Sequence, residues 1–305
     1  MKAVQFDRFG DLSVLEVREV PTPLPAVGEV RVRVAAAGIN PGEIAIRQGA
    51  FAQQWPSTFP EGEGSDFAGV IDMVGEGVSD FVHGDDVIGF VNNRSSHAEF
   101  VLVSERDITR KPASLSWDVA GSLFVAGTSG QALVDATSIG SGDTVVVSSA
   151  TGGTGLFASQ LARIAGATVI GLASESGHDW LRTVGITPVD YHGDNLAERV
   201  RDAASGPITA LLDTYGSRYI DLGFELGVSG GRIGTIADFT AANRGALVVN
   251  HSRAASAETL ARLADLVVAG KLNVPIAARY PLVDVRQAYT QLATRTTRGK
   301  IVLIP

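Results

Sequence analysis

A glycine-rich turn between two regular segments constrains the fold of this chain more than any other feature. The turn reads Ser-Ala-Thr-Gly-Gly-Thr-Gly over residues 149–155. Residues 144–149 form a short and mostly β-branched run, which is typical of a strand buried on both faces of a parallel sheet. After the turn, Phe157, Leu161 and Ile164 recur at helical spacing. The order strand, tight turn, helix predicts an α/β fold.

The same turn is suited to bind a dinucleotide. A helix N-terminus presents unpaired N–H groups and a partial positive charge, so a pyrophosphate can dock there. Glycine allows the close approach, because a Cβ would collide with the ligand. The spacing differs from G-x-G-x-x-G, but the strand–turn–helix context favours dinucleotide binding over a turn that binds nothing. The expected contact residues are Ala150, Thr151, Gly152, Gly153, Thr154 and Gly155.

The end of the second predicted strand, over residues 167–172, bears on the choice of dinucleotide. Sites for NAD usually carry an acidic residue there, about 20 residues beyond the first glycines. In this chain Ser174 takes that position and can donate to a 2′-phosphate, with His178 just beyond it. Glu175 would favour NAD if its side chain pointed inward. We expect NADPH, and the alternative is that these are solvated loop residues.

The remaining sequence divides into two regions. Residues 1–118 contain period-two alternation and predict a compact, mostly antiparallel β domain. Strand-like and helix-like segments alternate after that, which predicts a doubly wound parallel sheet. The expected helices are 117–135, 156–165, 195–204, 257–269 and 283–294, and the expected strands of the second region are 144–149, 167–172, 210–213 and 232–236. A last strand at 300–304 is compatible with a return to the β domain.

Composition excludes several classes of function. The 305 residues suffice for two domains, and the absence of cysteine excludes disulfides, thiol nucleophiles, iron–sulfur clusters and cysteine-ligated zinc. The net charge is −8 with scattered basic residues, so we expect no nucleic-acid partner. The first residues lack the apolar core of a signal peptide, and no apolar run approaches the roughly 20 residues of a membrane span. We therefore expect a cytoplasmic protein with no membrane partner.

Six short motifs occur in a recognisable order. They are G-I-N-P-G-E at 38–43, G-S-D-F-A-G-V-I at 64–71, V-G-E-G-V at 74–78, A-T-G-G-T-G at 150–155, S-G-G-R at 229–232 and R-G-K-I-V-L at 298–303. With these motifs the chain resembles the zinc-independent quinone oxidoreductases of the medium-chain dehydrogenase/reductase superfamily, the group that includes zeta-crystallin. The resemblance implies a GroES-like β domain of residues 1–118 and 273–305, with a Rossmann domain of residues 119–272 inserted. It also implies NADPH as cofactor, a quinone, enal or enone as substrate, and a homodimer.

The resemblance assigns roles to individual residues. Asn40 corresponds to an asparagine near the nicotinamide and the substrate, and Thr128 to a threonine that faces the nicotinamide amide. Tyr191 corresponds to a tyrosine near the 2′-phosphate, and Lys300, in the last motif, is included among the cofactor contacts. His178 stands about where many relatives have a phosphate-binding lysine, and a neutral histidine offers no positive charge.

The expected chemistry is hydride transfer without a metal. Zinc-dependent relatives carry G-H-E where this chain has G-S-D at 64–66. Hydride transfer leaves a negative oxygen that needs a hydrogen-bond donor or an acid. Asn40 can donate through its amide, and Glu43 is the only nearby carboxylate we consider, with a helix-start carboxylate as the competing interpretation. Enoyl reductases of the superfamily carry a tyrosine where Phe51 follows Gln-Gly-Ala here, and this difference favours a quinone, which needs no committed protein acid.

Two other functions stay open on the same fold. One is an NADPH-dependent enone or enal reductase, and the other is an NADPH-binding sensor or structural protein without turnover. The aromatic residues Phe51, Trp55 and Phe59 are compatible with the wall of an apolar acceptor pocket and equally with the core of the β domain.

Overall fold

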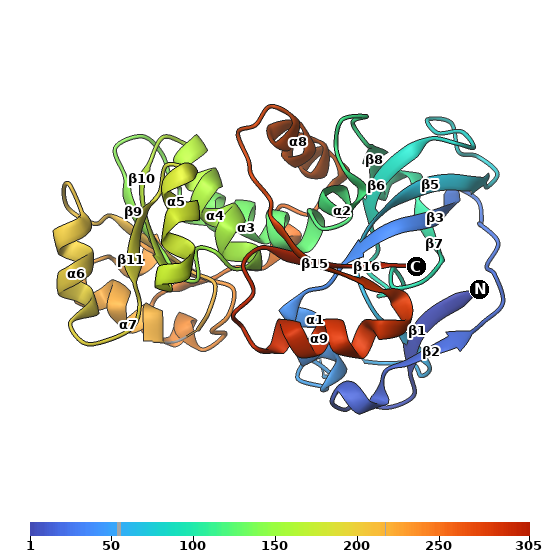
Figure 1. Ribbon diagram of the computed structural model, residues 1–305, viewed down its shortest axis with the longest axis horizontal. Helices are drawn as coiled ribbons and strands as arrows, with labels where there is room; N and C mark the ends of the chain where they lie inside the picture. Colours follow the sequence, from blue (N-terminus) through green and yellow to red (C-terminus); the bar gives the residue numbers. More distant parts are fainter. Residues whose placement is uncertain (54–55, 217) are drawn as a thin grey trace. The chain divides into compact units, whose positions relative to one another are not determined.

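The computed structural model describes residues 1–53, 56–216 and 218–305, whose internal contacts form two compact units (Figure 1). The first unit combines both ends of the chain: Met1–Val125, Ser256–Ala269 and Pro275–Pro305. The second unit consists of Ala126–Ala255 and Gly270–Val274. Each unit has its own β-sheet structure and its own apolar core.

A parallel sheet forms the centre of the second unit. Its described strands lie in the order β11-β10-β9-β12-β13-β14, and every neighbouring pair runs parallel. They span Thr187–Asp190 (β11), Thr168–Ala173 (β10), Thr144–Val147 (β9), Ala210–Asp213 (β12), Ile233–Thr235 (β13) and Leu247–Val248 (β14). This is the doubly wound order, with the reversal between β9 and β12. The predicted fold of this region is therefore confirmed.

Helices cover this sheet and bury its apolar residues. Val146, Ile170 and Leu211 of three neighbouring strands belong to one buried cluster. All four residues of β9 are buried, as expected for a strand covered on both faces. The helices are Phe124–Ala136 (α3, which begins in the first unit), Gly153–Ile164 (α4), His178–Thr183 (α5), Leu196–Ala203 (α6) and Arg218–Glu225 (α7).

The predicted helix over 117–135 is wrong as one continuous element. The structure has two helices, Trp117–Ala120 (α2) and α3, separated at residues 121–123. Gly121 lies against β3 at this break, where a Cβ would overlap the carbonyl oxygen of Ala36. Its own carbonyl accepts a hydrogen bond from the Gly38 backbone N–H at 2.7 Å. Contact with the sheet thus interrupts a sequence whose composition favours a helix.

The first unit contains two sheets. One has the order β2-β1-β4, and the other has β15-β16-β3-β5-β6-β8 with β7 also paired to β3. The pairing is antiparallel except between β15 and β16. The strands are Lys2–Phe6 (β1), Glu16–Glu19 (β2), Glu29–Gly38 (β3), Glu61–Gly62 (β4), Asp66–Val74 (β5), Asp86–Phe90 (β6), Phe100–Ser104 (β7), Ile108–Arg110 (β8), Ile276–Pro281 (β15) and Lys300–Ile304 (β16).

The C-terminal strand completes the β-sheet structure of the first unit. Leu303 of β16 pairs with Ala37 of β3, so the last strand returns to the N-terminal region (Figure 1). The other helices of this unit are Pro41–Arg47 (α1), Ala257–Val268 (α8) and Val285–Ala293 (α9). The contacts group α8 with the first unit, whereas the expected division assigned it to the second domain; the exact domain boundaries stay a prediction. Among the described residues, no helix has the length and apolar character needed to cross a membrane.

Candidate functional site

The glycine-rich turn presents backbone donors at the start of α4. Gly152 is the N-cap residue and supplies no side-chain hydrogen bond, and the first amides of a helix have no partner within it. Residues 151–154 are half-exposed. A Cβ on Gly155 would overlap the carbonyl oxygen of Ser149, which itself has a φ of 49°. The turn therefore needs glycine to stay tight, and the first amides of α4 fit a pyrophosphate.

Ser174 and Tyr191 leave neighbouring strands at the same edge of the sheet as this turn. Ala173 of β10 and Asp190 of β11 are partners in parallel register, and the two predicted residues directly follow them. Both side chains are half-buried, and the Tyr191 ring lies 4.1 Å from the ring of His192. The pair thus lies at the carboxyl edge of the sheet, where open α/β sheets bind their ligands.

His178 lies close to the glycine-rich turn through the loop that follows β10. A Cβ on Gly177 would press against the Thr151 side chain, so the loop and the turn are in contact. The half-buried His178 ring has Nε2 at 3.2 Å from the carbonyl oxygen of Ala173. Glu175 is exposed. The loop that carries Ser174 and His178 therefore lies against the turn.

Two other predicted cofactor contacts have no exposed surface. Thr128 on α3 and Ala150 in the turn each have a relative exposure of 0%. A fully buried side chain touches no incoming molecule in this conformation. A direct contact of either residue with a cofactor stays a prediction.

In the first unit, Asn40 and Glu43 form the N-terminal cap of α1. The Asn40 backbone N–H donates to Glu43 Oε2 at 2.7 Å, and Asn40 Nδ2 lies 3.3 Å from Glu43 Oε1. The Tyr289 hydroxyl of α9 donates to the same carboxylate at 2.6 Å. Burial raises the pKa of Glu43, against hydrogen bonds from Tyr289 and Asn40 that lower it. Glu43 therefore serves as the carboxylate of a capping box, and its catalytic role stays a prediction.

The side chain of Asn40 also contacts Asp66 and Lys300. Asn40 Nδ2 lies 3.3 Å from Asp66 Oδ2, while Lys300 Nζ donates to Asn40 Oδ1 at 2.6 Å and to the Ile39 carbonyl at 3.2 Å. An amide nitrogen has two hydrogens, and both are engaged by the carboxylates of Glu43 and Asp66. In this arrangement Asn40 has no N–H left for a substrate oxygen. Asp66 also corrects the expectation that Glu43 is the only carboxylate near Asn40.

Asp66 and Lys300 form a buried pair of opposite charge. Asp66 Oδ2 and Lys300 Nζ are 4.0 Å apart, and the two side chains are 0% and 2% exposed. Burial raises the pKa of Asp66 to about 6, an effect that Lys300 opposes. Burial likewise lowers the pKa of Lys300, opposed by Asp66. The other oxygen of Asp66 accepts from the Val125 backbone N–H at 2.9 Å, near the start of α3.

A second buried ion pair lies under Tyr289. Arg47 Nη1 contacts Glu63 Oε1, and the guanidinium lies 4.8 Å from the centre of the Tyr289 ring. Burial raises the pKa of Glu63 to about 8, against the attraction of Arg47. Burial also lowers the pKa of His97 to about 4. We call this set of interacting groups the buried polar cluster; it comprises Asn40, Glu43, Arg47, Glu63, Asp66, His97, Tyr289 and Lys300.

The aromatic residues proposed to wall an acceptor pocket differ in environment. Phe59 makes edge contacts with Phe6 and Phe9, with ring centres 5.9 and 5.2 Å away. Phe51 is half-buried, and Trp55 lies outside the described residues. The contacts of Phe59 are those of an aromatic cluster within the first unit.

Comparisons with known proteins match both regions of the chain. Residues 26–113 match the family model of the alcohol dehydrogenase GroES-like domain, and residues 185–303 match that of the zinc-binding dehydrogenases. The quinone oxidoreductase of Pseudomonas aeruginosa is 29% identical in an alignment that covers 100% of this chain and 99% of that protein. The chain belongs to the quinone oxidoreductase family of the medium-chain dehydrogenases/reductases.

Two further similarities accompany this assignment. The solved structure of the quinone oxidoreductase from Coxiella burnetii matches with a TM-score of 0.86 and 29% identity, covering 100% of this chain and 99% of that one. A mycocerosic acid synthase-like polyketide synthase of Mycobacterium tuberculosis is 32% identical over 96% of this chain, which corresponds to 15% of that longer protein. As a member of the family, the chain is an oxidoreductase that uses a nicotinamide cofactor and a small-molecule substrate, and its expected GroES-like domain is confirmed.

One of the two matching family models is described as a zinc-binding dehydrogenase. Within residues 1–53, 56–216 and 218–305, no group of three or more His, Asp or Glu side chains is arranged to hold a metal ion. At the motif position where zinc-dependent members have G-H-E, Asp66 is engaged by Asn40, Lys300 and the Val125 amide.

Sequence reasoning missed most of the buried polar cluster in this member of the family. Asp66 belongs to the G-S-D-F-A-G-V-I motif, but its contacts with Asn40 and Lys300 join residues 26 and 234 positions apart in the sequence. Tyr289 meets Glu43 across 246 positions, and nothing in the local sequence of α9 marks it. The available signal was a carboxylate at the start of an apolar strand, which on burial requires a partner.

Proposed function

We propose that this oxidoreductase uses NADPH and transfers a hydride to a quinone. The proposal rests on the carboxyl edge of the parallel sheet, where the loop that carries Ser174 and His178 lies against the glycine-rich turn that precedes α4. Free amides at a helix start bind pyrophosphate. A hydroxyl in the position where NAD sites usually carry an acidic residue leaves room for a 2′-phosphate, and Tyr191 adds a neighbouring aromatic group.

The residues of this edge have separate roles in binding. The amides of residues 153 and 154, at the start of α4, hold the pyrophosphate, and the Ser174 hydroxyl and the His178 ring contact the 2′-phosphate. When bound, the nicotinamide supplies the hydride, so the protein has to bind the cofactor and orient it against the acceptor. His178 stands about where many relatives have a phosphate-binding lysine, so we expect a moderate preference for NADPH.

The state of Asn40 supports a quinone as the acceptor. Both of its N–H groups are engaged by buried carboxylates, and Phe51 takes the position where enoyl reductases carry a tyrosine. An acceptor that takes its proton from water suits such a site best. A quinone meets this requirement, because its reduced anion is protonated by solvent.

The test is cofactor oxidation by the purified protein. We would offer a benzoquinone, a polycyclic ortho-quinone, an enone and a secondary ketone, each with NADPH and with NADH. The expected result is turnover of the quinones with a lower KM for NADPH than for NADH. Tight NADPH binding with no turnover of any quinone would contradict the proposal.

One observation favours a second function, reduction of the double bond of an enone or enal. That reaction needs a proton for the α-carbon, and the buried polar cluster contains Glu63, whose pKa burial raises to about 8 against the attraction of Arg47. Quinone reduction and double-bond reduction differ in the atom of the acceptor that receives the hydride. Deuteride from labelled NADPH at the β-carbon of a reduced enone would support the second function.

A further inference from the structure

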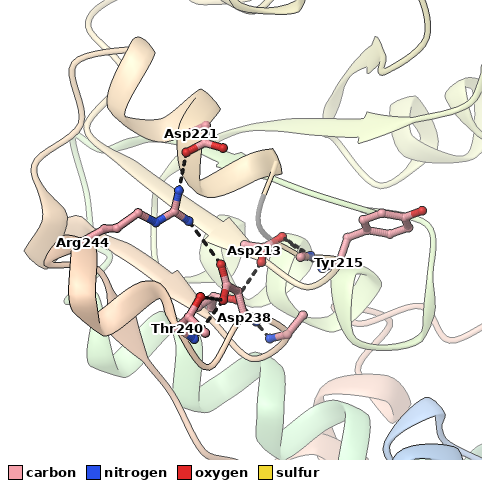
Figure 2. A network of polar contacts seen from close by, with 9 residues as sticks. Asp213, Tyr215, Asp221, Asp238, Thr240 and Arg244 are labelled. Carbon is pink, nitrogen blue, oxygen red and sulfur yellow. Dashed lines mark hydrogen bonds and ion pairs between the residues drawn. The ribbon is translucent and has the colours of Figure 1, made fainter.

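We propose that Asp213 is a positioning residue. It fixes the loops at the carboxyl edge of the parallel sheet that bind the nicotinamide half of the cofactor. Its carboxylate connects Ser148, which directly precedes the glycine-rich turn, to the loop after β12 and to Thr235 at the end of β13. Figure 2 shows Asp213 with Tyr215 in this network. The inference rests on the proposed use of a nicotinamide dinucleotide, because it concerns how this chain shapes the site for that molecule.

Asp213 is the last residue of β12 and is fully buried. Its Oδ1 accepts the Ser148 hydroxyl at 2.8 Å and the backbone N–H groups of Tyr215 and Gly216, both at 3.0 Å. Its Oδ2 accepts the Thr235 hydroxyl at 2.6 Å. Four donors from three segments therefore converge on one carboxylate.

The directions of these hydrogen bonds require a group that only accepts. The Thr235 oxygen already accepts from the backbone N–H groups of Ala237 at 3.0 Å and Asp238 at 3.1 Å, so its hydrogen has to go to Asp213. The Ser148 hydroxyl likewise accepts from the Thr214 N–H at 2.8 Å and donates to Asp213. An ionised carboxylate has no hydrogen to present and satisfies all its donors. An asparagine amide would place N–H groups against one set of donors in either orientation.

The position of this carboxylate in the sheet connects it to cofactor binding. Ser148 follows β9 and Asp213 ends β12, and the strand order reverses between these two strands. Doubly wound folds bind a dinucleotide across this crevice, with one half of the sheet for each mononucleotide. Asp213 therefore joins the two halves at the switch point. Its partner Thr235 ends β13, in the half opposite to Ser174 and Tyr191.

The loop after β13 continues the same network. Asp238 accepts from the Thr240 N–H at 2.9 Å and from its hydroxyl at 2.7 Å, and it pairs with Arg244 at 3.2 Å. Arg244 also contacts Asp221 on α7 (Figure 2). The hydrogen bonds from Thr240 lower the pKa of Asp238, with Arg244 acting in the same direction. The loop after β13 is thus fixed at its start by the hydrogen bonds to Thr235 and further along by the ion pair between Asp238 and Arg244.

The test compares two ligands that differ in which half of the site they fill. NADPH fills both halves, whereas 2′,5′-ADP fills only the adenosine half, next to Ser174 and Tyr191. For Asp213→Asn we expect the Kd for NADPH to rise on the order of tenfold or more, because donors are left unpaired. The Kd for 2′,5′-ADP should stay within about twofold of wild type, a change worth less than half a kcal/mol. Titration calorimetry measures both, and Asp202→Asn, an exposed residue of α6, is the control of equal charge change.

A second pair of variants covers the case in which Asp213→Asn does not fold. Thr235→Ser keeps the hydroxyl and should bind both ligands like wild type. Thr235→Val keeps the shape, loses the hydroxyl and should lose NADPH affinity selectively. Equal losses for the two ligands would indicate a general structural role and overturn the inference, as would unchanged NADPH binding. If wild-type protein binds neither ligand, the proposed function itself fails, which these titrations distinguish from failure of the Asp213 role.

Discussion

Replacing Lys300 with methionine should destabilise the first unit, and the loss should grow as the pH rises. Lys300 is 2% exposed. Its ammonium group donates hydrogen bonds to the Asn40 side chain and the Ile39 carbonyl and forms an ion pair with the Asp66 carboxylate. Methionine keeps much of the volume but leaves Asp66 as a buried charge without a cation. Removal of one partner from a buried ion pair typically costs about 3–5 kcal/mol.

The pH dependence follows from the pKa of Asp66. In the wild type burial raises this pKa from 3.8 to about 6, although Lys300 opposes the rise. As the pH rises, the unfolded chain therefore releases this proton first, so stability falls between these values and levels off above about pH 6. Without Lys300 the pKa of Asp66 in the folded state is higher still, so the stability of the variant continues to fall above pH 6. The unfolding free energy of Lys300→Met therefore falls by up to about 1.4 kcal/mol per pH unit, or by up to about 2.7 kcal/mol between pH 6 and 8.

The assay is urea unfolding of wild type and Lys300→Met at pH 6, 7 and 8, followed by circular dichroism. The difference in unfolding free energy should widen from pH 6 to pH 8. Lys2→Met, at an exposed lysine of β1, should show no such trend. Adding Asp66→Asn to Lys300→Met should remove the pH dependence. A loss of equal size at all three pH values would refute the reasoning, because Asp66 would then not be the titrating group.

Four further changes test the two sites. Gly155→Ala should abolish NADPH binding in calorimetry and lower the Tm by several degrees, since overpacking costs about 1–3 kcal/mol, while Gly206→Ala, where a Cβ meets open space, should do neither. Ser174→Asp should weaken NADPH binding at least about tenfold and improve NADH binding, measured as two KM values, because a carboxylate repels the 2′-phosphate. Tyr191→Ala should raise the KM for NADPH more than that for NADH, and equal losses would count against its assignment. Glu43→Gln should cost about 1–2 kcal/mol in urea unfolding, because it weakens the capping box of α1.

The strand–turn–helix unit could be predicted from sequence because its signals are local. The signals are the apolar run before the glycine-rich turn, the turn itself and the spacing of Phe157 and Leu161. In the structure they correspond to β9, α4 and the turn between them. The break between α2 and α3 could not be predicted in this way. It depends on the approach of Gly121 to the carbonyl oxygen of Ala36, and this contact joins segments 85 positions apart.

The hydrogen-bond networks around Asp66 and Asp213 could not be predicted from the sequence for a related reason. Asp66 begins β5 and Asp213 ends β12, and an acidic residue at the edge of an apolar run is typical of a turn. In the structure each is fully buried, and each gathers partners from other segments of its own unit. Burial of an isolated carboxylate is costly, so such a residue persists only where donors surround it. A buried carboxylate at the edge of a strand in an α/β chain therefore indicates donors that are distant in sequence. For Asp66 such a donor is Asn40, and for Asp213 they are Ser148 and Thr235 around the switch point of the parallel sheet.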